Sequence, residues 1–228
     1  MKFATKPSRR ETILGGIYLI LYVFVLPMAV PMAVVRLLPW VNTAQSNAIF
    51  FAINFAATLL IFRDYLIRTC QDALRVPGKT LWAAILGYLG SMMLSTLVSL
   101  AILRLYPEFT NVNDSAITAM SRQSRTLMAI GGVFLAPLTE ELLFRGLIFR
   151  NLYGKSRFFA YALSMVLFSL IHVSGYIGLY EWKLLALCFV QYLAPALCLN
   201  LAYRYSGTLV APILLHMLNN LAAFSAMR

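Results

Sequence analysis

The stretch "LTEELLFRG" (138–146) places two glutamates and an arginine inside a segment that otherwise has the composition of a membrane-spanning helix. A carboxylate near the centre of a bilayer costs at least ~2.5 kcal/mol, even on scales derived from insertion experiments. Such side chains face the interior of a helix bundle or a wet cavity, and they usually serve a function. We therefore expect Glu140, Glu141 and Arg145 to lie inside a bundle and away from lipid.

The composition of the whole chain supports a membrane location. Of its 228 residues, 61% are hydrophobic and 12% are charged, whereas a soluble domain is about 45–50% apolar and about 25% charged. The net charge of +11 comes from basic residues near the ends of predicted spans, where topology and anionic headgroups account for them. Nucleic-acid binding is thereby excluded, and the expected partners are the lipid bilayer and a membrane-associated protein or peptide.

Apolar segments long enough to cross a bilayer recur along the sequence. The predicted spans are 13–35, 45–62, 80–103, 126–148, 158–177, 184–203 and 208–225. Pro27 and Pro31 predict a kink in the first span. The segment "RDYLIRTCQDALRVPGK" (63–79) alternates basic and apolar residues and predicts an amphipathic helix at the membrane interface. The expected fold class is an all-α polytopic bundle of about seven transmembrane spans plus this interfacial helix.

The basic residues also predict an orientation. Twelve of them fall on one side of the predicted spans and six on the other, with Arg145 set aside as intramembrane. The side with the excess is expected to be cytoplasmic, which places the N-terminus in the cytoplasm and the C-terminus outside, in a cytoplasmic (inner) membrane. The run 13–35 lacks a cleavage site and is longer than the core of a signal peptide, so we interpret it as a span. Cys70, Cys188 and Cys198 show neither metal-ligand nor disulfide spacing and are expected to pack as small apolar residues.

The candidate functional residues inside the predicted spans form three clusters, and each cluster contains a pair of residues four positions apart. Glu141 and Arg145 are four apart, so they can pair on one face, while Glu140 points about 100° away. The second cluster is Phe168 with His172, and the third is His216 with Asn220. Both histidines of the chain thus lie in apolar runs.

These residue types suit one kind of chemistry. A carboxylate with an imidazole can act as a general base toward water, and the remaining donors can hold the oxyanion that forms when a carbonyl is attacked. This set allows peptide-bond hydrolysis without a serine or cysteine nucleophile.

The three motifs, in this order, resemble those of the CAAX-processing and bacteriocin-processing (Abi) family of intramembrane proteases, which includes the type II CAAX prenyl proteases. The resemblance covers roughly residues 126–225. It implies a glutamate-dependent endopeptidase without a cofactor. In that scheme Glu140 activates water with His172, and His216 and Asn220 stabilise the oxyanion. Glu141 and Arg145 shape the site, and Phe168 packs beneath it. The chain is then one integral membrane domain, with an N-terminal transmembrane region (1–125) that includes the interfacial helix and a polar loop, and a catalytic transmembrane core (126–228).

Other readings of the same residues remain open. Glu140, His172 and His216 could bind zinc and a metal-bound water, although the His-Glu-x-x-His spacing is absent. The chain could instead be a non-catalytic immunity or assembly scaffold, or a transporter with a proton-coupled carboxylate. The polar clusters could also be structural, as an interhelical salt bridge and interhelical hydrogen bonds.

Overall fold

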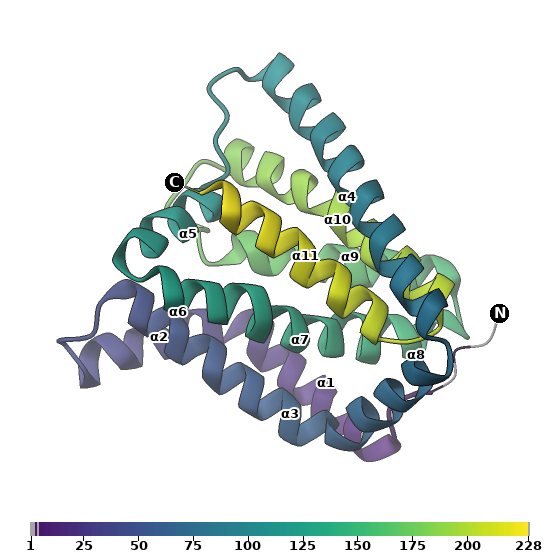
Figure 1. Ribbon diagram of the computed structural model, residues 1–228. Coiled ribbons are helices and arrows are strands. Elements are labelled where there is room, and N and C mark those ends of the chain that lie inside the picture. The colour runs from purple at the N-terminus through teal and green to yellow at the C-terminus, as the bar shows by residue number, and fades with distance from the viewer. Residues whose placement is uncertain (1–2, 4, 228) are drawn as a thin grey trace.

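The computed structural model describes residue 3 and residues 5–227, which form helices joined by short connections (Figure 1). In chain order these are α1 (Arg9–Phe24), α2 (Leu26–Leu37), α3 (Thr43–Arg75), α4 (Pro77–Leu105), α5 (Val112–Gln123), α6 (Arg125–Ala129), η1 (Ile130–Leu135), α7 (Ala136–Glu141), η2 (Leu142–Phe149), α8 (Arg150–Tyr153), α9 (Arg157–Ser174), α10 (Trp182–Ser206) and α11 (Val210–Ala226). The two η segments are π-helical turns, so α6 to α8 run on as one helix. The all-α prediction is confirmed.

The predicted number of spans is matched approximately. In the described part of the chain, α3, α4, α9, α10 and the continuous helix 125–153 are each long and apolar enough to cross a membrane. Helices α1 and α2 add a sixth span if they count as one, and they meet at 65°. Pro27, in the first turn of α2, has no N–H to continue the ladder, which accounts for the predicted kink. Helix α11 is apolar but only 17 residues long.

Residues 63–75 are helical, as predicted, but they do not form a separate helix. They continue α3 beyond a kink at Phe62, whose backbone (φ −107°, ψ 16°) leaves helical geometry. The buried backbone N–H of Tyr65, in the turn that follows, donates to Glu11 Oε1 at 2.6 Å. The Glu11 carboxylate of α1 thus accepts a hydrogen bond from a backbone N–H near the kink. Helix α3 then continues to Arg75, and α4 begins at Pro77.

The continuous helix 125–153 is the centre of the bundle. In Figure 1 it runs between α1 and α3 on one side and α9 and α10 on the other, with α11 across its front. Every residue of its second π segment is buried. Gly146 permits this close packing, because a Cβ there would lie 2.8 Å from Cε1 of Tyr65. The segment with the paired glutamates is therefore enclosed by protein.

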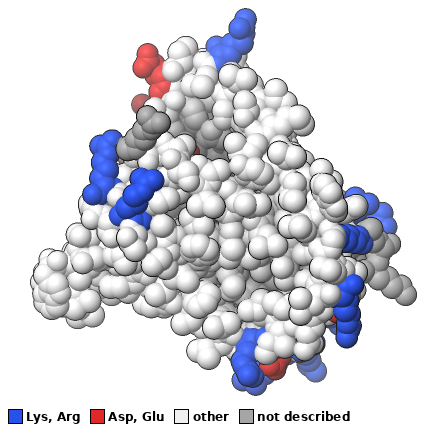
Figure 2. Space-filling view, viewed as in Figure 1, with Lys and Arg blue, Asp and Glu red and all other residues white. Residues whose placement is uncertain are grey.

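The charged residues that flank the apolar segments of the sequence lie at the two ends of the bundle. At one end Arg150 donates from Nε to Thr5 O at 2.8 Å, and Leu209 N donates to Thr69 Oγ1 at 3.0 Å. At the other end Arg125 donates from Nη1 to Met227 O at 3.0 Å. Figure 2 shows charged side chains at these ends and a broad uncharged surface between them. Lys2 and Arg228, which enter the orientation count, lie outside the described residues, and the side that faces the cytoplasm stays a prediction.

We expect Glu11→Ala to destabilise the bundle. Besides the Tyr65 N–H, Glu11 accepts hydrogen bonds from Ser8 N at 2.6 Å and Arg68 Nη2 at 3.0 Å. Its removal leaves a buried backbone donor unpaired, at a cost of about 1–3 kcal/mol. Thermal unfolding in detergent measures the loss, with the exposed neighbour Arg10→Ala as the control. Equal unfolding midpoints for the two variants would contradict this role.

Candidate active site

A buried charge cluster joins the central helix to α11. Arg145 donates from Nη1 to Glu141 Oε1 at 2.9 Å, and this oxygen lies 2.8 Å from His216 Nδ1. Glu141 and Arg145 are fully buried, and His216 is 3% exposed. The spacing of four residues predicted the first contact. The second contact was not predicted, because it depends on how α11 packs against the central helix.

Each nitrogen of the Arg145 guanidinium donates to a protein acceptor. Besides Glu141, it donates from Nε to Asn200 Oδ1 at 3.2 Å and from Nη2 to Ala196 O at 3.2 Å. Its Cζ also lies 4.5 Å from the ring centroid of Phe168. Burial of an arginine is costly unless its charge is paired and its donors find acceptors. Here Glu141 pairs the charge, and each of the three nitrogens has an acceptor.

Asn200 is a site residue that the sequence reasoning missed. It lies in α10, is fully buried, and its Oδ1 also accepts a hydrogen bond from Ser164 Oγ at 3.0 Å. An amide inside the apolar run 184–203, three residues before its end, is the signal that could have identified it. Asn200 thus links α9 and α10 to Arg145.

Glu140 points away from Glu141, as the helical geometry predicts. Its Oε1 accepts a long hydrogen bond from the Tyr22 hydroxyl at 3.4 Å, and its Oε2 lies 4.0 Å from His216 Nε2. Among the described residues, none donates a hydrogen bond to this Oε2. The imidazole of His216 therefore lies between two carboxylates, and Glu140 keeps one oxygen free to accept a proton. Tyr22, from α1, was not anticipated.

His172 is fixed through one of its ring nitrogens. Its Nδ1 lies 2.8 Å from the carbonyl oxygen of Phe168. Because a carbonyl can only accept, Nδ1 carries the proton, and Nε2 of the neutral ring is left as an acceptor. Phe168 contacts both imidazoles, with centroid separations of 4.7 Å to His172 and 5.5 Å to His216. Phe168 therefore packs against both histidines, and its supporting role in catalysis stays a prediction.

Asn220 satisfies a backbone group that the central helix leaves open. Its Nδ2 donates to Gly132 O at 2.8 Å. At the end of the π segment the N–H of Ala136 donates to Gly131 O, five residues earlier. By the same interval, the donor to Gly132 O would be the N–H of residue 137. That residue is Pro137, which has no N–H. One amide hydrogen of Asn220 fills this gap, and the second stays available.

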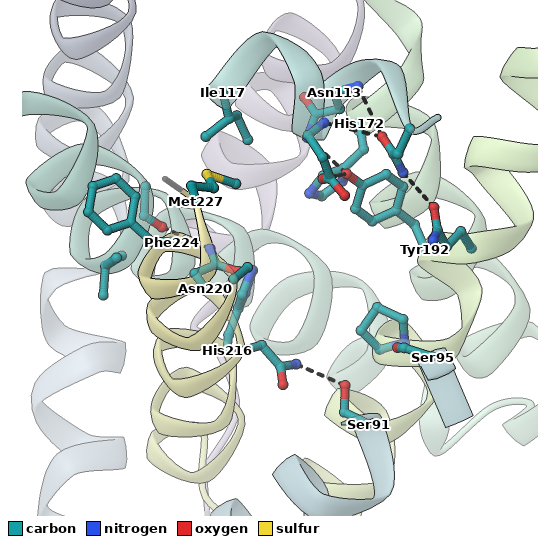
Figure 3. Close-up of a pocket in the computed structure, with 18 of the residues that line it drawn as sticks. Ser91, Ser95, Asn113, Ile117, His172, Tyr192, His216, Asn220, Phe224 and Met227 are labelled. Carbon is teal, nitrogen blue, oxygen red and sulfur yellow. Dashed lines mark hydrogen bonds between the residues drawn. The ribbon is translucent and has the colours of Figure 1, made fainter. Parts of the chain in front are cut away.

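A cavity of about 270 Å³ connects four of the predicted site residues, Phe168 among them. His172, His216 and Asn220 line it, as Figure 3 shows, with His216 and Asn220 on successive turns of α11. Asn113 of α5 and Tyr192 of α10 also belong to the wall. Glu140 is not part of this lining and is connected to the cavity through His216.

The described residues contain no group of three or more His, Cys, Asp and Glu side chains placed to hold a metal ion. The trio Glu140, His172 and His216 thus does not form such a group in this arrangement. The contact with Glu140 is made by His216, whereas the Nδ1 of His172 is engaged by its own helix.

Comparison with protein families identifies the C-terminal part of the chain. Residues 122–222 match the family model described as type II CAAX prenyl endopeptidase Rce1-like. This segment is similar to Rce1-like domains. It contains all seven site residues predicted from the sequence, while Tyr22 lies outside it. No curated protein and no solved structure matched the chain. The Rce1-like family is a protease family, so protease activity is supported at the family level.

The role of Asn220 predicts a specific coupling with Pro137. Asn220→Ala leaves Gly132 O without its donor and is expected to cost about 1–3 kcal/mol of stability. In a Pro137→Ala background residue 137 regains an N–H, so the same substitution should cost less. Thermal unfolding of the parent, both single variants and the double variant in detergent measures the difference. An equal cost of Asn220→Ala in both backgrounds would rule out this account of the backbone.

Proposed function

We propose that this chain is an intramembrane endopeptidase that hydrolyses a peptide bond in a membrane-associated protein or peptide. The processing is of the CAAX type or a related removal of a C-terminal segment or propeptide. One observation carries the proposal. Glu140 and Glu141 lie on either side of His216, and His216 lines, together with His172 and Asn220, a partly open cavity in the bundle. A protease family match over the same residues supports it.

In this proposal Glu140 is the general base. Its free Oε2 takes a proton from water as the water oxygen attacks the carbonyl carbon of the substrate. His172, whose Nε2 is an acceptor, orients the same water from the cavity side. The second N–H of Asn220, together with Nε2 of His216 when it is protonated, holds the tetrahedral oxyanion. The proton then passes to the amide nitrogen, and the C–N bond breaks.

Glu141 and Arg145 have a supporting role in this scheme. The Glu141 carboxylate accepts from His216 Nδ1, which orients Nε2 of that ring toward Glu140. An imidazole held by a carboxylate keeps one tautomer and one direction. The guanidinium of Arg145 balances the charge of Glu141 inside the bundle.

The central test is Glu140→Gln. Because a general base contributes about 10²–10⁴-fold, we expect cleavage to slow by at least about 100-fold while the unfolding midpoint in detergent stays close to that of the parent. The measurement compares the C-termini of membrane proteins in cells that produce the parent or the variant, followed by cleavage of an identified substrate in liposomes. The exposed acid Glu108→Gln serves as the control. Hydrolysis by Glu140→Gln at the parent rate would refute the assignment.

Glu141→Gln is expected to lower stability more than Glu140→Gln does, and to lower cleavage less. It leaves the Arg145 charge without its partner, and breaking a buried ion pair costs about 3–5 kcal/mol. We therefore expect a larger loss of thermal stability than for Glu140→Gln, with a smaller loss of cleavage per folded molecule. The reverse order in both measurements would contradict the division of roles between the two glutamates.

The same assays separate the alternative functions. Cleavage that survives exhaustive chelation excludes a zinc mechanism, whereas loss that zinc restores favours one. A scaffold without catalysis predicts that Glu140→Ala still complements a deletion of the gene. A proton-coupled transporter predicts proton-dependent flux in liposomes and no cleaved product.

A further inference from the structure

We propose that Tyr192 is a positioning residue for His172, and that α5 holds Tyr192 in place through Asn113 and Asp114. This inference rests on the proposed function, in which His172 acts on the water. The two α5 residues that it adds, Asn113 and Asp114, lie before the Rce1-like match, which begins at residue 122.

The contact between the two rings is close. The Tyr192 ring of α10 stacks on the imidazole of His172 with centroids 4.1 Å apart and planes 28° from parallel. The hydrogen bond from Nδ1 to Phe168 O restrains the imidazole at one edge, and the stacked ring restrains rotation of its plane. Together these contacts fix the direction of Nε2, the atom that would meet the water.

Two side chains of α5 hold the Tyr192 hydroxyl. Asn113 Nδ2 donates to it at 2.9 Å, and the hydroxyl donates to Asp114 Oδ1 at 3.0 Å. Tyr176, in the turn that follows α9, donates to Asn113 Oδ1 at 3.3 Å. A hydroxyl bound to a carboxylate makes one of the stronger hydrogen bonds in proteins. The tyrosine is thus fixed at its tip as well as along its face.

Helix α5 is itself anchored beside the cavity. Asn111 caps its N-terminus through the backbone N–H groups of Asn113 and Asp114, and its own Nδ2 donates to Gln191 Oε1 at 2.7 Å. Figure 3 shows Asn113, Tyr192 and His172 close together on one side of the cavity, across from His216 and Asn220. The α5 network therefore lies next to the imidazole that it is proposed to orient.

A purely structural role for this network makes a different prediction. If the hydrogen bonds only hold α5 to α10, their loss lowers stability and leaves the ring of His172 and the turnover of folded molecules unchanged. If Tyr192 positions His172, turnover and the environment of that ring change together. The number of histidines makes the second readout accessible, since the chain has only two.

The first experiment follows the histidine Cε1–H signals by NMR in the full chain in detergent micelles, with assignment by His172→Gln. Because the resonance of His172 depends on its position against the Tyr192 ring, Tyr192→Phe, which keeps the ring and removes both hydrogen bonds to α5, should displace the His172 signal and leave the His216 signal in place. Tyr205→Leu, an exposed tyrosine of the same helix, should displace neither. An unmoved His172 signal in Tyr192→Phe would overturn the proposal, whatever the outcome for cleavage.

The second experiment measures kcat and KM with a peptide that the parent cleaves. We expect Tyr192→Leu to lower kcat by at least about tenfold with KM within about twofold, and Tyr192→Phe, which keeps the ring, to lose less. Asp114→Asn retains an acceptor oxygen and should stay near the parent, whereas Asp114→Ala should fall to the level of Tyr192→Phe. A kcat of Tyr192→Leu equal to that of Tyr205→Leu would refute the positioning role. Loss of activity in Glu140→Gln would still support the proposed function in that case.

Discussion

The Glu141 carboxylate is the point on which the interior of this protein depends. It accepts from Arg145 on its own helix and from His216 on α11, with all three side chains almost completely buried. A buried carboxylate must be compensated by charge and donors, so this one anion fixes both the direction of Arg145 and the packing of α11. Glu140, one position earlier, then meets the other nitrogen of the same imidazole. The arrangement gives two adjacent glutamates different surroundings: Glu141 Oε1 meets both Arg145 and His216, whereas Glu140 Oε1 has only the long hydrogen bond from Tyr22.

Departures from regular helix supply the rest of the geometry. The π segment before Pro137 shifts the backbone hydrogen bonds by one residue, and Pro137 itself has no N–H to donate. The carbonyl oxygen of Gly132 therefore accepts its hydrogen bond from Asn220. π turns are frequent at functional sites because they offer backbone groups that a regular helix would consume. The second π segment, which contains Arg145, is buried on all sides. The central helix is thus an irregular element stabilised by its neighbours, and this is where the polar side chains of α11 attach.

Local spacing allowed part of this to be predicted. Four-residue intervals predicted the Glu141–Arg145 pair and the separate direction of Glu140, and the apolar runs predicted an all-α membrane bundle. Contacts between distant segments were not accessible: Tyr22 meets Glu140 across 118 residues, and α5 reaches Tyr192 across 79. Such contacts depend on the rotation of each helix about its axis, which no local pattern specifies. The continuity of α3 through residues 63–75 was missed for a related reason, because the donor freed near its kink is satisfied by Glu11 of another helix.

The most direct test of this account is the coupling between Glu141 and His216. Thermal unfolding in detergent of Glu141→Gln, His216→Asn and the double variant yields the interaction free energy of the pair. Residues joined in one buried network couple by about 0.5–3 kcal/mol, and we expect a value of at least about 1 kcal/mol, with the double variant less destabilised than the sum of the single losses. Losses that add to within about 0.3 kcal/mol would show that the two side chains act independently and would contradict the account.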